Sequence, residues 1–184
     1  LKAPLGSAYT YLCLGAGWST SCNTPFRMHK TWVHEGGTCT PLLAHWPKGI
    51  EGCGELRRTP GHVIDVVPTI LELAGARAQE QGENAPPAPG ESLVSAFAKD
   101  ITIDRDYLWW FHDGNRAIRT GDWKLVASKD QPWELFNLAK DRTETKNLAT
   151  QLPLKVGELS QLWLAKQNDF IKTVAAEPKS KKRK

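Results

Sequence analysis

The residues best suited to chemistry lie in one short stretch, residues 26–37, which read FRMHKTWVHEGG. Arg27, His29 and Lys30 bring three cationic or potentially cationic side chains together just ahead of Glu-Gly-Gly. Guanidinium and ammonium groups bind oxyanions because they supply both positive charge and several hydrogen-bond donors. The stretch therefore indicates an anion site beside a tight backbone turn, although composition alone would favour an exposed lysine at the end of a loop for Lys30.

Two other side chains are candidates, each with a simpler structural alternative. Glu35 precedes the two glycines and could act as an acid or base, but we favour a carboxylate that bonds backbone amides in the turn. His112 ends an aromatic-rich run beside Asp113, from where it could reach over a substrate pocket. The favoured alternative is a histidine at the end of a hairpin that bonds its neighbour. Arg116 and Arg119 are expected to bridge strands.

The four cysteines all lie in the first third of the chain, and no pair of them has the spacing of a zinc site. No Cys-x-x-C pair occurs, and no histidine follows at zinc-finger spacing. We therefore assign no metal ligand to this chain. One or two disulfides and four buried thiols both remain open for Cys13, Cys22, Cys39 and Cys53.

The net charge of +4 comes mostly from the last residues, PKSKKRK, which lie in a basic tail at residues 177–184 that is expected to be disordered. Without PKSKKRK the chain has 19 basic and 20 acidic residues. A neutral body argues against a nucleic-acid partner, which needs a basic surface. No apolar run approaches the roughly 20 residues of a bilayer span, so no membrane span is expected.

The first half of the chain supplies elements that must hold the cationic stretch. Residues 1–25 are rich in Gly, Ser and Thr and are expected to form a loop. The run TPLLAHWP, residues 40–47, ends in a proline and predicts a short buried strand. Apolar residues at helical spacing then predict a helix over residues 63–74, with Asp65 at its cap and Gly75 after its end.

A polar, Pro- and Gly-rich break over residues 76–90 separates this half from a second half of different character. Three aromatic-rich runs, DYLWWFH, RAIRT-GD-WKLVAS and PWELFNL, predict β-strands, with a hairpin at Gly121-Asp122. A helix is expected from about Pro153 to Phe170, because its apolar residues form one stripe. The pattern predicts a small antiparallel sheet with a helix packed across it.

The cationic stretch also resembles a segment of the sulfatase family. NTPFRMHKTWVHEGGTCTPLLAHWPKGI is similar to the segment that sulfatases carry after their metal-binding Asp-Asn pair, with a lysine five residues before the Glu of Glu-Gly-Gly. Here those positions are Lys30, Glu35, Gly36 and Gly37, and Pro41 follows. The resemblance continues in the same order through RTPGHVIDVVPTILELAGA, GNRAIRTGDWKLVA and PWELFNLAKDRTETKNLA.

This resemblance implies an α/β fold like that of alkaline phosphatase. Residues 1–85 would complete the large catalytic domain, and residues 86–176 would form the small α+β domain with its antiparallel sheet and packed helix. Sulfatases hydrolyse sulfate esters with a formylglycine made from Cys or Ser and with a calcium ion that holds the sulfate oxygens. Lys30 would bind the sulfate and act in catalysis, His112 would contact the substrate, and the substrate would be a sulfated small molecule or carbohydrate.

The chain departs from the family in lacking the formylglycine signature, Cys/Ser-x-Pro/Ala-x-Arg, and the Asp-Asn metal pair. The nucleophile and the calcium ligands are therefore expected upstream of Leu1, in an N-terminal remainder that would be this segment's partner, and the segment alone is expected to be inactive. A phosphatase or phosphodiesterase of the same superfold and a catalytically inactive binding or scaffold fragment are the alternatives. The location is open, with the periplasm or secretion favoured over the cytoplasm.

Overall fold

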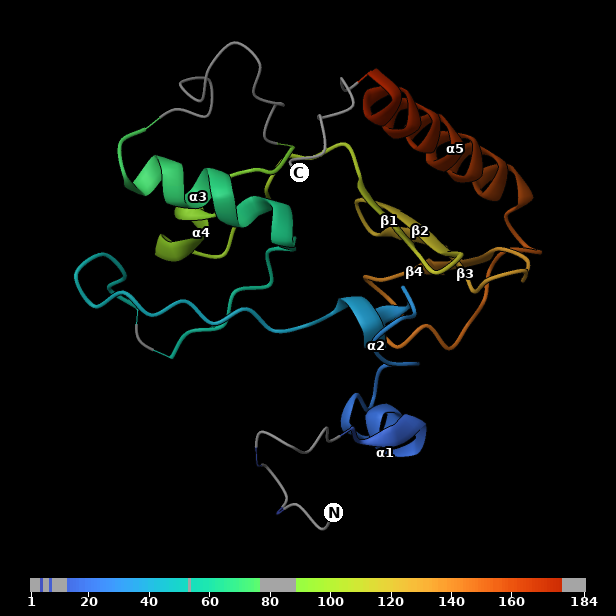
Figure 1. Ribbon diagram of the computed structural model, residues 1–184, viewed down its shortest axis with the longest axis horizontal. Coiled ribbons are helices and arrows are strands. Elements are labelled where there is room, and N and C mark those ends of the chain that lie inside the picture. The colour runs from blue at the N-terminus through green and yellow to red at the C-terminus, as the bar shows by residue number, and fades with distance from the viewer. Residues whose placement is uncertain (1–3, 5–6, 8–12, 53, 77–88, 177–184) are drawn as a thin grey trace, which may run out of the picture. The chain divides into compact units, whose positions relative to one another are not determined.

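A computed structural model describes residues 4, 7, 13–52, 54–76 and 89–176 (Figure 1). The predicted basic tail and most of the predicted boundary at 76–90 lie outside the described residues. The chain forms two compact units: Leu1–Thr40 packs with Trp109–Lys184, and Pro41–Leu108 forms the other unit. The assignment of residues 1–85 to a larger domain stays a prediction.

The first unit contains a four-stranded sheet with the strand order β1-β2-β3-β4. Strands β2 and β3 are antiparallel, as are β3 and β4. Thr120 pairs with Trp123, and Gly121 between them has a φ of +55°, which glycine adopts without a steric penalty. The predicted hairpin at this position is confirmed. The strands are β1 (Leu108–His112), β2 (Asn115–Thr120), β3 (Trp123–Ala127) and β4 (Glu134–Asn137).

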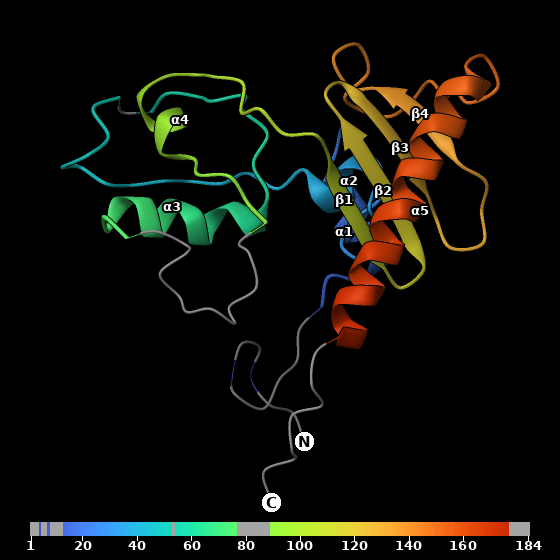
Figure 2. The same ribbon diagram turned by 90° about the horizontal axis from the view of Figure 1, so that it is seen from above.

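Helix α5 (Pro153–Ala176) lies across one face of this sheet, as predicted (Figure 2). Leu159 and Trp163 on the helix are buried, and the Trp163 ring stacks on Trp109 of β1 with 5.5 Å between the ring centroids. The opposite face of the sheet packs on Val33, close to the short helix α2 (Glu35–Thr38). The strands alternate between these two faces, so each sheet residue belongs either to the α5 side or to the α2 side.

The segment before α2 contains a helix, α1 (Gly15–Cys22), where a loop was expected. That expectation is wrong because local bonds stabilise the turns of this Gly- and Ser-rich run: the Thr20 hydroxyl donates to the Ala16 carbonyl, and the Asn23 amide donates to the Ser19 carbonyl. No residue of α1 is buried. A helix that buries no face needs no apolar periodicity, so the sequence offers no such pattern from which α1 could be predicted.

The second unit contains a 3₁₀ turn, η1 (Val63–Asp65), and the helices α3 (Val66–Leu73) and α4 (Val94–Ala98). Asp65 precedes α3, as predicted, and its buried carboxylate accepts from the backbone N–H groups of His62 and Glu91. Its Oδ2 also lies 2.8 Å from Nη2 of Arg105. Asp65 thus holds three separate segments of this unit together.

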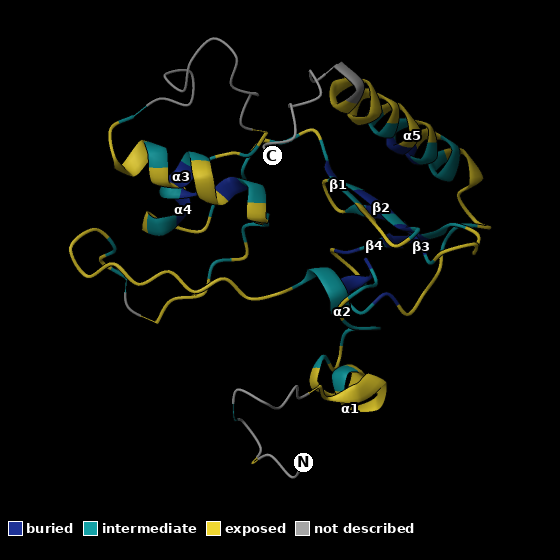
Figure 3. Ribbon diagram, viewed as in Figure 1, coloured by how far each residue is buried: buried dark blue, intermediate teal, exposed yellow. Residues whose placement is uncertain are grey.

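The predicted buried strand at residues 40–47 is wrong. The segment has no strand hydrogen bonding, and Leu42 and Leu43 are 67% and 88% exposed (Figure 3). A strand needs a neighbour to pair with its backbone groups, and the described part of the chain offers none here. Exposed apolar residues continue over the unit, including Val67 and Ile70 of α3. None of the helices among the described residues is long and apolar enough to cross a bilayer.

Candidate functional site: the Lys30 loop

Lys30 lies in a turn and is exposed. Met28 and Thr31, on either side of it, have φ values of +65° and +96°, which are uncommon for residues other than glycine. Among the described residues, none is seen to form an ion pair or hydrogen bond with the Lys30 ammonium group. The charge of Lys30 is therefore available to a ligand, while the backbone that carries it follows an unusual path.

The other two members of the cationic stretch are engaged within the protein. The Arg27 guanidinium donates to the Glu144 carbonyl oxygen at 2.8 Å, and its Nη2 lies 3.5 Å from Glu134 Oε1. The His29 ring is 3.0 Å from the Thr20 hydroxyl. Arg27 thus stabilises the loop and does not share an anion site with Lys30. The sequence brought these side chains together, but the fold directs them to different partners.

Gly36 and Gly37 allow the loop that carries Lys30 (residues 27–35, the Lys30 loop) to pack against the start of α2. A Cβ on Gly36 would overlap the carbonyl oxygens of Arg27 and Met28, and a Cβ on Gly37 would overlap the carbonyl oxygen of Trp32. The Gly36 N–H donates to the Arg27 carbonyl at 2.8 Å. Neither glycine is required for a positive φ, so close backbone approach is the reason for both.

Glu35 is a buried structural residue, as the sequence favoured, but its carboxylate pairs with side chains and not with the backbone amides that were expected. Its Oε1 lies 2.8 Å from Lys124 Nζ, and its Oε2 lies 3.3 Å from Arg142. Its backbone N–H donates to Glu144 Oε2 at 2.8 Å. The sequence analysis named neither Lys124 nor Glu144. One signal was present: the alternation of WKLVA places Lys124 on the same face of β3 as the core residue Val126.

His34 anchors the loop from the residue before α2. It is buried, and its Nε2 lies 2.9 Å from Glu134 Oε2. The hydrogen bond from His34 and the nearby Arg27 guanidinium lower the pKa of Glu134 below its usual range, against the opposing effect of burial. Glu134 is therefore held as a carboxylate that ties both Arg27 and His34 to β4.

His112 lies exposed at the end of β1, where its Nε2 is 3.4 Å from the Asp113 carboxylate. The chain turns immediately afterwards through Asp113 and Gly114, which have φ values of +49° and +83°. This is the hairpin-end geometry of the simpler alternative. A role for His112 in substrate binding stays a prediction.

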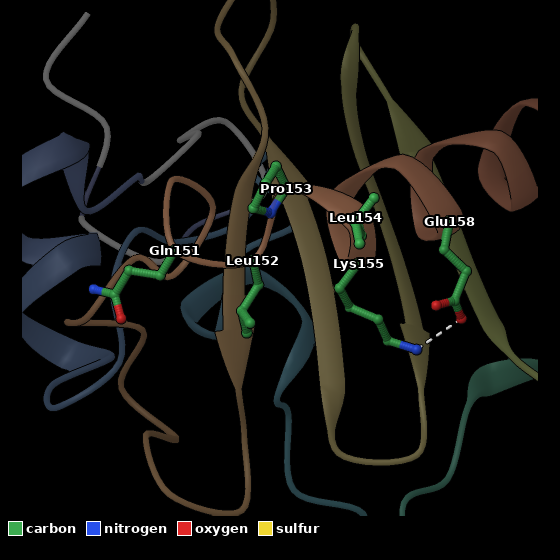
Figure 4. Close-up of a pocket in the computed structure, with 6 residues that line it drawn as sticks. All are labelled: Gln151, Leu152, Pro153, Leu154, Lys155 and Glu158. Carbon is green, nitrogen blue, oxygen red and sulfur yellow. Dashed lines mark hydrogen bonds and ion pairs between the residues drawn. The ribbon is translucent and has the colours of Figure 1, made fainter.

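A surface hollow lies at the N-terminal end of α5 (Figure 4), and none of the candidate residues Lys30, Glu35 and His112 lines it. The one lysine in it, Lys155, already pairs with Glu158 at 2.7 Å. The hollow therefore offers no free charge and no nucleophile. It is lined by Gln151, Leu152, Pro153, Leu154, Lys155 and Glu158.

Within the described ranges, no group of three or more His, Cys, Asp or Glu side chains could hold a metal ion. Cys13, Cys22 and Cys39 are free thiols. These residues thus do not form the donor set that a calcium ion requires, which is six to eight oxygen ligands.

Comparison with known proteins decides the family. The family model described as N-sulphoglucosamine sulphohydrolase, C-terminal, matches residues 26–161, which include the Lys30 loop, the sheet and the start of α5. The chain belongs to the sulfatase family. The sulfatase resemblance of the cationic stretch is thereby confirmed, as is its assignment to the C-terminal portion.

Curated sulfatases and a solved structure are similar to the chain. An uncharacterized sulfatase of Schizosaccharomyces pombe is 30% identical over 87% of the chain and 30% of the relative. An N-acetylgalactosamine-6-O-sulfatase of Bacteroides thetaiotaomicron is 29% identical over 74% of the chain and 29% of the relative. A solved structure from a study of glycosaminoglycan metabolism by the same bacterium is 26% identical, with a TM-score of 0.65 over 78% of the chain and 32% of its own.

The chain spans about 30% of the length of these sulfatase relatives. The fold class is confirmed by the structural likeness together with the four-stranded antiparallel sheet and packed helix. Membership of the sulfatase family thus explains why the four segments that resemble sulfatases occur in this order along the chain.

Proposed function

We propose that the complete protein containing this chain hydrolyses sulfate esters and that Lys30 binds the sulfate group. The observation that carries the proposal is the geometry of Lys30: an exposed ammonium group without a partner among the described residues, on a loop whose two ends are bonded to Glu144. Sulfuryl transfer requires positive charge already positioned where negative charge develops. Lys30 meets that requirement, and the neighbouring cations Arg27 and His29 are engaged elsewhere.

The nucleophile and the metal would come from other parts of the protein. In the full enzyme, formylglycine would supply the nucleophile and calcium would hold the sulfate oxygens. The part played by this chain is narrower: Lys30 would neutralise a sulfate oxygen near the leaving group, and the loop around it would keep the ammonium in place.

Sulfated carbohydrates are the substrate class that we favour. The support is the name of one relative, an N-acetylgalactosamine-6-O-sulfatase, together with the glycosaminoglycan context of the similar solved structure. An exposed histidine such as His112 could donate or accept a hydrogen bond at a sugar hydroxyl. The free end of β1 is thus a second place at which substrate contact is proposed.

The rest of the protein would cover the apolar surface of the second unit. Val67 and Ile70 of α3 are 50% and 59% exposed, and Leu43 is more exposed still. Continuous exposed apolar surface of this kind marks an interaction site in a stable protein. We propose that residues 41–73 pack against the preceding part of the large domain.

The test is the activity of the complete protein toward an aryl sulfate and the matching aryl phosphate. We expect the sulfate to be preferred and Lys30→Ala to lower kcat/KM by about 10²–10³-fold, the usual cost of losing one charge-stabilising group. The matched control is Lys172→Ala, which removes an exposed lysine that lies on α5 and not on the Lys30 loop. This variant should leave kcat/KM unchanged. Preference for the phosphate would favour the phosphatase alternative, and no hydrolysis of either ester would favour an inactive scaffold.

A further inference from the structure

We propose that Lys124, Glu35 and Glu144 are positioning residues, which form a buried ion cluster by which the antiparallel sheet fixes the loop that carries Lys30. The inference rests on the proposed role of Lys30 in binding sulfate. It assigns the small sheet a task in the reaction, because the sheet would set the place of the sulfate-binding ammonium.

Lys124 is the centre of the cluster. It lies in the middle of β3 with 0% of its surface exposed. Its Nζ is 2.8 Å from Glu35 Oε1, 3.0 Å from Glu144 Oε1 and 3.3 Å from the Thr38 hydroxyl. Two of these contacts are hydrogen bonds, to Glu35 and Thr38 of α2, and the contact with Glu144, in the segment after β4, is an ion pair. Lys124 thus connects the sheet to the end of the Lys30 loop.

Glu144 forms hydrogen bonds with residues at both ends of the loop. Its Oε2 accepts from the Glu35 backbone N–H at 2.8 Å, and its carbonyl oxygen accepts from the Arg27 guanidinium at 2.8 Å. Glu144 is fully buried and has a φ of +55°. A single residue therefore holds the chain just before and just after Lys30.

Further contacts hold the middle and the far end of the loop. The side-chain amide of Asn115, at the start of β2, donates to the Thr31 carbonyl at 3.1 Å. His34 is bonded to Glu134 of β4. The residues around Lys30 are thus tied to the sheet by side chains from β2, β3 and β4, whereas the Lys30 ammonium group has no partner among the residues that the structure describes. A fixed backbone beneath a free charge is the arrangement expected of a pre-organised binding group.

The cluster is balanced in charge, because Lys124 and Arg142 oppose Glu35 and Glu144. A buried ion group of this kind gives no net stability over well-packed apolar residues, since burial of each charge is costly. Stability alone is therefore a weak reason for the cluster. The cluster bonds to both ends of one loop, and this arrangement is a stronger reason for its presence.

A double-mutant cycle in the complete protein tests the inference. Glu144→Gln should lower kcat/KM for an aryl sulfate by about 10–100-fold, because a displacement of about 1 Å has an effect of that order. In the Lys30→Ala background the same change should lower kcat/KM less than about twofold, because its effect acts through Lys30. Amide hydrogen exchange in residues 27–35 should be faster in Glu144→Gln, which reports on the loop independently of activity.

Arg105→Met is the matched control, because it breaks the buried pair with Asp65 in the other unit and leaves the loop bonds intact. It should lower stability without faster exchange in residues 27–35. If Glu144→Gln does not fold, the charge-balanced double variant Lys124→Met/Glu144→Gln takes its place and should give the same non-additivity with Lys30→Ala.

The possible results separate the two proposals. A large effect of Lys30→Ala with a fully additive effect of Glu144→Gln overturns the positioning role alone. Unchanged hydrogen exchange in residues 27–35 also overturns it. If Lys30→Ala leaves kcat/KM unchanged, the sulfate-binding role falls, and the positioning role falls with it.

Discussion

Replacement of Lys124 by methionine should strongly destabilise the protein, because Lys124 is buried between two carboxylates. The substitution keeps most of the side-chain volume but removes the charge that pairs with Glu35 and Glu144. Both carboxylates are buried, and only Glu35 keeps another cationic partner, Arg142. Loss of one partner from a buried ion pair costs about 3–5 kcal/mol, because the remaining charge is left uncompensated.

The assay is guanidinium unfolding of the complete protein, followed by intrinsic tryptophan fluorescence, to which Trp109, Trp133 and Trp163 contribute. These rings lie together against β1 and α5 and so report on the unit that contains Lys124. A loss of 3–5 kcal/mol should move the unfolding midpoint of this unit down by about 1 M. The charge-balanced variant Lys124→Met/Glu144→Gln should recover part of the loss, because only one carboxylate then remains and Arg142 faces it.

The matched control is Lys155→Met. Its pair with Glu158 has an N···O distance of 2.7 Å, similar to that of Lys124 with Glu35, but Lys155 and Glu158 are 28% and 61% exposed. An exposed pair contributes no more than about 1 kcal/mol, so this variant should unfold almost as the unchanged protein does. Equal effects of the two substitutions, or a cost below about 1 kcal/mol for Lys124→Met, would refute the reasoning from burial.

Two further predictions concern the chain as a whole and its pH dependence. The isolated 184-residue chain should aggregate or unfold without a cooperative transition, because residues 41–73 expose apolar side chains that lack a partner; a sharp melt of a monomer by calorimetry and sedimentation would contradict this. Glu134 has a folded-state pKa lowered below the ordinary value of 4.5, so its contribution to stability is fully present above that value and is lost as the pH falls through the lowered pKa. The difference in unfolding free energy between the protein and Glu134→Gln should therefore be constant at neutral pH and shrink in acid, whereas a difference that grows toward low pH would disprove the assignment.

Local patterns in the sequence were sufficient for the small sheet and its helix. The hairpin at Gly121 follows from a turn residue between two β-prone runs, and α5 follows from apolar residues at helical spacing after Pro153. The cap at Asp65 was predictable for the same reason, since the residue before a helix is chosen by its immediate neighbours. These features need no information from distant parts of the chain.

The errors at residues 40–47 and at Arg27 arose where structure depends on partners that are far apart in sequence. Residues 40–47 have the composition of a buried strand, yet a strand forms only where another chain segment completes its hydrogen bonds. Arg27 is a residue type that often binds anions. Its guanidinium instead contacts Glu134 and Glu144, which lie more than 100 residues later in the sequence. No spacing within a short motif carries information about such pairs.

Lys30 stands five residues before Glu35 and two glycines follow, and this spacing, together with three further segments in the same order, was enough to indicate the sulfatase family; the anion-binding role of Lys30 stays a prediction. Only the tertiary structure decided which charges are free and which are held. Lys124 and Lys30 are chemically identical in the sequence, but one is buried between two carboxylates and the other is exposed without a partner among the described residues. The physical reason is that the energy of a charge depends on its surroundings, and folding brings those surroundings together from β3, α2 and the segment after β4.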